Sequence, residues 1–164
     1  MPDAAVVTME EAVRRADEVR SRGGIVVLAN GCFDLLHVGH VRYLEGARRE
    51  GDFLVVAVNS DRSVRRLKGP GRPILAEQDR AELVAALRPV DLVFVFDDPT
   101  VDQVIRRLRP HVHAKGTDYT TDSVPERETM ARIGGRVVIV GDAKSHSTRD
   151  LLVRIRKLTG QAKP

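Results

Sequence analysis

The chain has 164 residues, of which 42% are hydrophobic and 30% charged, and its formal net charge is +4. This length is typical of one domain, and the balance of apolar and charged residues excludes a disordered chain. No apolar run approaches the roughly 18 residues that a membrane span needs, so we expect no membrane segment. Cys32 is the single cysteine and cannot form an internal disulfide. Without a secretory leader, the chain is expected to be cytoplasmic.

The first predicted element is a helix over residues 8–22. Thr8 and Glu11 have the spacing of a capping box, and the apolar stripe that follows ends near Gly23. Short apolar runs rich in β-branched residues then predict strands at 25–29, 53–58, 92–96 and 137–140, with a fifth at 112–115. Helical spacing lies between and after them, at 41–49, 77–87, 101–108, 125–133 and 148–158. Residues 159–164 are expected to be a flexible tail.

The alternation of strands and helices predicts a doubly wound, Rossmann-like α/β fold. Continuous apolar strands indicate a parallel five-stranded sheet with helices on both faces, in a single domain over residues 1–164. Ligands of such sheets bind beyond the carboxyl ends of the strands. The loops at 30–40, 59–73, 97–100, 115–124 and 141–148 are therefore the candidate functional segments.

The densest group of functional side chains lies in the first of these loops, Gly31-Cys-Phe-Asp-Leu-Leu-His-Val-Gly-His40. It connects a strand to a helix, where free N–H groups and the helix dipole favour anions. His37 and His40 are three residues apart, so both imidazoles can donate to phosphate oxygens, and each would be most useful protonated. Metal ligation by this pair is not favoured, because no second cluster completes a tetrahedral site. Asp34 either caps the helix or orients the loop or a substrate.

This loop also carries a resemblance to a known family. It is similar to the Gly-x-Phe-Asp-x-x-His-x-Gly-His signature of the cytidylyltransferase-like nucleotidyltransferases. The continuation Val58-Asn-Ser-Asp-Arg-Ser-Val-Arg-Arg-Leu-Lys-Gly69, then Arg72-Pro73 and Lys115-Gly-Thr-Asp-Tyr119, most resembles the heptose 1-phosphate adenylyltransferases within that family. The resemblance runs from about residue 26 to residue 152.

The resemblance implies an activity and its partners. It implies transfer of AMP from ATP to a heptose 1-phosphate, with release of pyrophosphate, to give ADP-heptose for lipopolysaccharide synthesis. Mg²⁺ is expected to arrive with the nucleotide, without a metal site of the protein's own. A homodimer is expected, as is a separate sugar kinase, since the chain contains no kinase domain. A cytidylyltransferase or guanylyltransferase acting on glycerol 3-phosphate or another sugar or alditol phosphate is the alternative.

The resemblance also implies roles for individual residues. The catalytic residues it implies are His37, His40 and Lys68. The nucleotide-binding residues are Asn30, Gly31, Cys32, Phe33, Gly39, His40, Lys115, Asp118, Tyr119, Ser147 and Thr148. The acceptor-binding residues are Asp34, Asp61, Arg72 and Arg80. On residue type alone, Ser147 is a helix cap, Asp61 is equally a cap of the next turn, and a solvated charge is the less favoured alternative for Lys68. Lys144 lies where related cytidylyltransferases place an arginine.

A nucleic-acid-binding protein and an electron carrier are the alternatives to an enzyme. The positive charge is compatible with nucleic acid, but aromatic residues make up 4% of the chain and do not interleave with basic ones, as single-strand binding requires. A flavodoxin-like electron carrier would have a Ser/Thr-rich phosphate loop after its first strand. The histidine-rich loop of this chain argues against it, and we expect no nucleic-acid partner.

Overall fold

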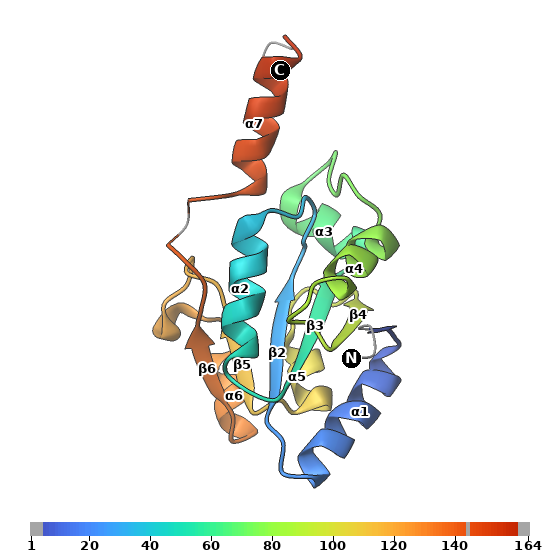
Figure 1. Ribbon diagram of the computed structural model, residues 1–164, viewed down its shortest axis with the longest axis vertical. Coiled ribbons are helices and arrows are strands. Elements are labelled where there is room, and N and C mark those ends of the chain that lie inside the picture. The colour runs from blue at the N-terminus through green and yellow to red at the C-terminus, as the bar shows by residue number, and fades with distance from the viewer. Residues whose placement is uncertain (1–4, 144, 161–164) are drawn as a thin grey trace.

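A parallel six-stranded sheet forms the centre of the fold (Figure 1). The computed structural model describes residues 5–143 and 145–160. The strands are β1 (Ala5–Val6), β2 (Val26–Gly31), β3 (Phe53–Asn59), β4 (Leu92–Phe96), β5 (Val112–Lys115) and β6 (Arg136–Ile139), in the order β1-β4-β3-β2-β5-β6. The predicted count of five is wrong. The additional strand, β1, pairs only two residues with β4 at the edge of the sheet, too few to produce a pattern in the sequence.

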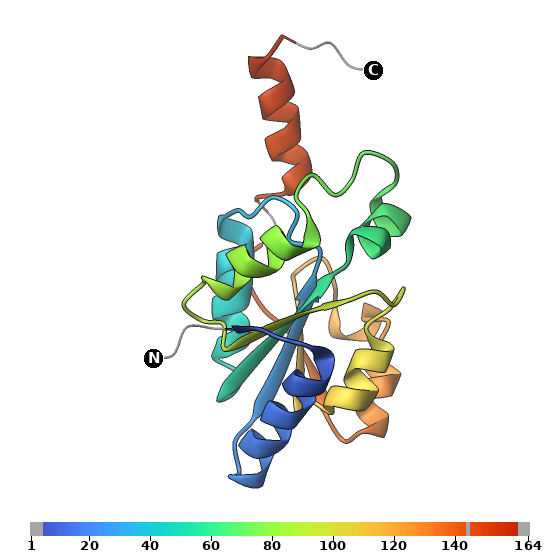
Figure 2. The same cartoon turned by 90° about the vertical axis from the view of Figure 1, so that its right-hand side faces the viewer.

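Helices cover both faces of the sheet, as predicted (Figure 2). They are α1 (Met9–Ser21), α2 (Val38–Arg48), α3 (Asp61–Lys68), α4 (Glu77–Ala85), α5 (Asp102–Leu108), a 3-10 turn η1 (Thr121–Ser123), α6 (Arg127–Arg132) and α7 (Thr148–Leu158). Alternate residues of β2 face opposite sides: Leu28 packs with α1, α5 and α6, whereas Val27 packs with α2 and α4. This division of one apolar strand between two cores is the reason for its continuous hydrophobicity.

The helices at the two ends of the chain differ in how they are stabilised. Helix α1 begins as the capping-box spacing predicts, with Thr8 accepting a hydrogen bond from the Glu11 amide at 3.2 Å. Helix α7 has its predicted bounds but buries none of its residues, and it extends away from the body of the molecule (Figures 1 and 2). Residues 161–164 of the predicted tail lie outside the described part of the chain. Within the described part, no helix combines the length and apolarity that crossing a bilayer requires.

Helix α3 was not predicted, because the sequence after β3 suggested a loop. Only Val64 and Leu67 are apolar in its eight residues, and Leu67 is exposed. The helix is nevertheless capped by Ser60, whose hydroxyl accepts from the Ser63 amide at 3.0 Å. Ser60, and not Asp61, therefore holds the cap position. Lys68 is the last helical residue, and Gly69, with φ of 88°, ends the helix in a conformation that side chains disfavour.

The sheet has a topological switch point between β2 and β5. From β2 the chain winds outward through β3 to β4, whereas β5 and β6 lie on the other side. The helices on either side of the switch point leave a crevice beyond the carboxyl ends of β2 and β5, where ligands of doubly wound sheets bind. The loops after these two strands therefore face each other across this crevice.

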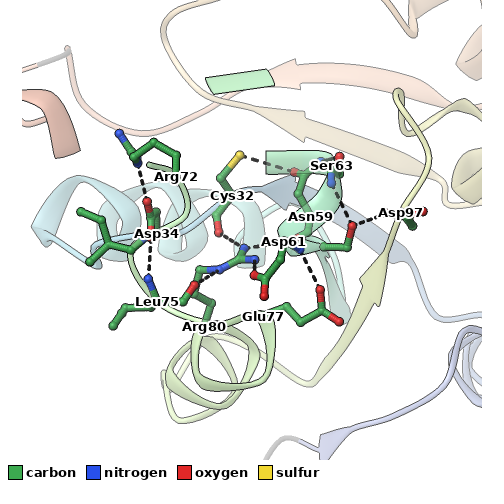
Figure 3. Close-up of polar contacts among 12 residues, drawn as sticks. Cys32, Asp34, Asn59, Asp61, Ser63, Arg72, Leu75, Glu77, Arg80 and Asp97 are labelled. Atoms are coloured by element: carbon green, nitrogen blue, oxygen red, sulfur yellow. Dashed lines mark hydrogen bonds and ion pairs between the residues drawn. The ribbon is translucent and has the colours of Figure 1, made fainter. Parts of the chain in front are cut away.

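A completely buried guanidinium connects helix α4 to the loops after β2 and β3 (Figure 3). Arg80 donates from Nε to the carbonyl of Leu75 at 3.0 Å, and from Nη1 to the carbonyls of Cys32 at 2.6 Å and Asn59 at 2.7 Å. Its Nη2 donates to Asp61 Oδ1 at 2.8 Å. Because its donors meet protein oxygens and none of its surface is exposed, this arrangement gives Arg80 a structural role, and its contact with the acceptor stays a prediction. We call these five residues the Arg80 clamp.

A second buried polar group, His113, lies in β5 among the core residues. Its Nε2 is 2.9 Å from Asn30 Oδ1, while Nδ1 has no hydrogen-bond partner among the described residues. The neutral tautomer with a proton on Nε2 satisfies the Asn30 contact. Burial, reinforced by the nearby charge of Lys115 and opposed by Asp102, lowers the pKa of His113 from 6.5 to about 3.

The Arg80 clamp yields a prediction about stability. We expect Arg80→Lys to lower the free energy of unfolding by at least about 2 kcal/mol, because an ammonium group cannot reproduce the guanidinium fork and leaves buried carbonyls unpaired. Urea denaturation measures this loss. Arg88→Lys, at an exposed position of the same region, is the matched control and should change stability by no more than about 0.5 kcal/mol. Equal stabilities for the two variants would contradict the clamp.

His113 yields a prediction about pH. The unfolded imidazole takes up a proton near pH 6.5 while the folded one stays neutral, so stability is constant above that pH and falls as pH falls toward 3. Between about pH 7.5 and about pH 5 the loss from this one group is about 2 kcal/mol. In urea titrations at both pH values, His113→Gln should lose less stability than the parent by that amount. An identical loss in both proteins would show that His113 does not titrate on unfolding.

Candidate active site

A cavity of about 1130 Å³ lies beyond the carboxyl ends of the central strands. Its walls come from the loop after β2, the start of α2, the end of α3, the loops after β4, β5 and β6, and the first turn of α7. The residues predicted from the sequence that line it are Asn30, Gly31, Cys32, Phe33, Asp34, His37, Gly39, His40, Lys68, Arg72, Lys115, Asp118, Tyr119, Ser147 and Thr148. Asp61 and Arg80 belong to the Arg80 clamp and are not part of this wall.

The two histidines form a stacked pair at the start of helix α2. His37 is the N-cap, and its ring lies 3.9 Å from that of His40, with an angle of 22° between the planes. The helix begins at Val38, three residues before the predicted start, so His40 lies in its first turn. A Cβ at Gly39 would come within 2.9 Å of the His37 ring, so a larger residue there would displace that ring.

The protonation of His40 differs from what the sequence suggested. Burial, together with the charges of His37 and Lys68, lowers the pKa of His40 from 6.5 to about 4. The imidazole is therefore neutral in the ligand-free protein at neutral pH, whereas the protonated form was the more useful one for contacts with phosphate. The His37 amide donates to His40 Nδ1 at 3.3 Å, which leaves the ring proton on Nε2. His40 is thus a neutral hydrogen-bond donor.

Asp34 ties the loop after β2 to the segment before α4. It is almost completely buried and accepts from Arg72 Nε at 2.6 Å and from the amides of Ile74 at 2.7 Å and Leu75 at 3.0 Å. Burial opposes its ionisation, but these three donors outweigh burial and hold the pKa of the carboxyl below its usual value. Since His37 is the cap of α2, the capping interpretation of Asp34 is wrong, and the loop-orienting one fits its contacts.

Two positive side chains and a thiol complete this side of the cavity. Lys68 is exposed at the end of α3, whereas the Arg72 side chain is held by Asp34 with 20% of its surface exposed. Cys32 Sγ is 3.8 Å from Asn59 Oδ1, and burial raises the pKa of the thiol. A protonated thiol is a weak nucleophile, so Cys32 is suited to lining the cavity and not to covalent chemistry.

The loop after β5 supplies the opposite wall. Lys115 is buried, with Nζ 3.8 Å from Glu126 Oε2 and 4.6 Å from the centre of the Tyr119 ring. Burial lowers the pKa of Lys115, and Glu126 partly offsets this effect. Asp118 is exposed on the same loop. Glu126 was not predicted as a site residue, because it lies beyond the Lys115-to-Tyr119 segment and no local pattern distinguishes it from a surface glutamate.

The first turn of helix α7 provides a second helix start at the cavity. Ser147 is the N-cap: its hydroxyl accepts from the Asp150 amide at 3.1 Å and is 2.7 Å from Asp150 Oδ2. Thr148 Oγ1 lies 3.5 Å from the carbonyl of Leu35, in the loop after β2. The starts of α2 and α7 therefore line one cavity, which favours a ligand with several negative charges. Lys144, just before this turn, lies outside the described residues.

Comparison with known proteins gives relatives over most of the chain. It is 49% identical over 150 residues to the bifunctional protein HldE of Syntrophotalea carbinolica, covering 91% of this chain and 31% of the relative. It is 49% identical over 153 residues to the same-named protein of Gluconobacter oxydans, covering 93% of this chain and 32% of the relative. The chain thus spans about a third of the length of these relatives.

A solved structure and a family profile agree with this relationship. The crystal structure of the lipopolysaccharide core biosynthesis protein from Thermoplasma volcanium is similar, with a TM-score of 0.63 and 30% identity, over 74% of this chain and 100% of that one. The sequence profile described as Cytidylyltransferase-like matches residues 28–155, which include every wall of the cavity. The chain belongs to the cytidylyltransferase-like family.

Proposed function

We propose that this chain is a nucleotidyltransferase that transfers AMP from ATP to a heptose 1-phosphate, with release of pyrophosphate and formation of ADP-heptose. The observation that carries the proposal is the convergence of two helix starts, a stacked histidine pair and Lys68 on one cavity. Such a cavity suits a triphosphate and a second phosphate, the two substrates of nucleotidyl transfer.

The chemistry requires little of the protein beyond position and charge. A phosphate oxygen of the acceptor attacks the α-phosphorus of ATP, the new P–O bond forms, and the bond to the β-phosphate oxygen breaks as pyrophosphate leaves. Because the attacking oxygen is already anionic, no general base or covalent nucleophile is needed. His40 would donate from Nε2 to an oxygen that gains charge as pyrophosphate leaves, and Lys68 would neutralise part of that charge.

Magnesium ion would enter with the nucleotide. Among the described residues, no three His, Cys, Asp or Glu side chains cluster to hold a metal ion. Phosphate oxygens and water would therefore supply most of its ligands, which is usual for Mg²⁺ in sites that act on nucleotides. The ion would neutralise phosphate charge in the cavity, while His37, His40 and Lys68 would contact the triphosphate.

The proposed heptose and adenine specificities are supported by the sequence resemblance and by the relatives. The Lys115-to-Tyr119 segment and the loop after β2 resemble the heptose 1-phosphate adenylyltransferases, and the similar solved structure is titled a lipopolysaccharide core biosynthesis protein. A homodimer and a kinase that supplies the heptose 1-phosphate belong to the proposal through the family resemblance alone.

A substrate matrix tests the proposal. The four common nucleoside triphosphates are combined with heptose 1-phosphate in both anomers, other sugar 1-phosphates and glycerol 3-phosphate, and pyrophosphate release is measured. We expect turnover with ATP and a heptose 1-phosphate. A preference for CTP of about tenfold or more, equivalent to about 1.4 kcal/mol, would overturn the proposed substrates but leave nucleotidyl transfer intact. No pyrophosphate from any pair would overturn the activity itself.

His40 is expected to act on the transition state. Loss of one preorganised donor to developing charge costs on the order of 10²–10³ in turnover, about 3 to 4 kcal/mol, so His40→Ala should lower kcat on that scale at saturating ATP. His40→Gln, whose amide can donate near the position of Nε2, is the matched variant and should recover part of this loss. A change confined to KM would show that His40 only binds the ground state.

A further inference from the structure

One wall of the cavity has no role in holding phosphates. The phosphates are expected at the starts of α2 and α7, and Lys68 and Arg72 lie on the β3 side. A further wall, residues 115–126, follows β5 on the other side of the switch point. A nucleotide whose phosphates occupy the helix starts and whose α-phosphorus faces the β3 side therefore extends its nucleoside toward the β5 side.

Glu126 is the unusual residue of this wall. Its carboxylate is almost completely buried although it lines the cavity, and Oε2 accepts no hydrogen bond from any described residue. Its nearest cation, Lys115 Nζ, is 3.8 Å away, which is within ion-pair distance but too long for a hydrogen bond. Glu126 precedes α6 at its N-cap position, yet its side chain makes no capping hydrogen bond.

A buried carboxylate oxygen without a donor, such as Glu126 Oε2, is costly, because it loses water and gains no replacement hydrogen bond. Pairing with Lys115 offsets the charge but leaves lone pairs unsatisfied. Such a group is stabilised when a ligand brings an N–H or O–H donor to it. The nucleoside has two kinds of donor: the exocyclic amine of the base and the hydroxyls of the ribose.

The surroundings of Glu126 favour the base. Tyr119 offers an aromatic ring on the same wall, and Pro125 and Val140 add apolar surface. Flat apolar surfaces suit a base better than a ribose. We propose that the Glu126 carboxylate accepts a hydrogen bond from the exocyclic amine of the bound base, and so selects adenine over 6-oxopurines, whose carbonyl oxygen would face a carboxylate.

This inference rests on the proposed function for the presence of a nucleotide in the cavity. Equilibrium binding without acceptor tests it, because no turnover occurs. Titration calorimetry with the magnesium complexes of ATP and ITP compares two nucleotides whose bases differ at position 6, an amine in ATP and a carbonyl in ITP, and at the adjacent N1, which carries a proton only in ITP. The wild-type protein should bind ATP about 10- to 100-fold more tightly, the range expected for one charge-assisted hydrogen bond. Equal affinity for ATP and ITP overturns the inference without need of any variant.

A variant then assigns the selectivity to the side chain. In Glu126→Gln the amide offers a carbonyl to adenine and an NH₂ group to a 6-oxopurine, so the ratio of the two dissociation constants should fall to within about threefold. Glu128→Gln is the matched control: its side chain is exposed on the same helix and should keep the wild-type ratio. An unchanged ratio in Glu126→Gln overturns the inference.

Deoxynucleotides test the alternative donor. The 2′-deoxy and 3′-deoxy forms of ATP should bind the wild-type protein and Glu126→Gln with the same penalty relative to ATP, because the carboxylate does not contact the ribose. If the penalty disappears only in Glu126→Gln, the carboxylate binds the ribose and the assignment to the base is overturned. Absence of binding by every nucleotide overturns the proposed function as well, so the two failures are distinguishable.

Discussion

The buried guanidinium of Arg80 is the interaction on which the cavity depends. Burying a charged group removes its water, and the loss is offset only when protein oxygens meet its donors. In this chain those oxygens belong to backbone or acidic groups of Cys32, Asn59, Asp61 and Leu75, which are far apart in the sequence. The hydrogen bonds of this one side chain therefore fix three segments relative to one another: the loop after β2, the loop after β3 and the start of α4.

Asp34 connects segments in the same way, as a buried negative charge that accepts hydrogen bonds. Its carboxylate collects donors from Arg72 and two backbone amides, so the loop after β2 is held at a second point to the segment before α4. The groups of this loop that we propose to bind phosphate are thus oriented before a ligand arrives. Preorganised donors act without reorganisation during the reaction, which is how a site without base or nucleophile accelerates a transfer. The neutral His40 is likewise oriented before a ligand arrives, because its Nδ1 accepts a hydrogen bond from the His37 amide.

The sequence predicts the fold and the membership of the cavity well, but not the local geometry. Continuous apolar runs and a periodic helical spacing identify the central strands and α1, since both patterns arise from burial of regular elements. Strand β1 and helix α3 were missed because one is two residues long and the other exposes most of its surface. Arg80 was assigned to the acceptor because its charge is visible in the sequence, whereas its burial follows from contacts with distant loops. Glu126 could not be predicted for the same reason, because its burial results from tertiary packing and not from a local sequence pattern.

The cavity is assembled from segments near residues 30, 68, 96, 117 and 147, so no single loop or helix of the chain contains it. A ligand that binds this cavity therefore binds only the complete native state. By mass action, the bound ligand stabilises the native state by an amount set by its concentration relative to Kd, and a concentration one hundred times Kd contributes about 2.7 kcal/mol. Occupancy should also slow proteolysis at positions far from the cavity, because cleavage requires the global opening that the ligand opposes. In this architecture a bound ligand stabilises the whole sheet against unfolding, and not only the loops that it contacts.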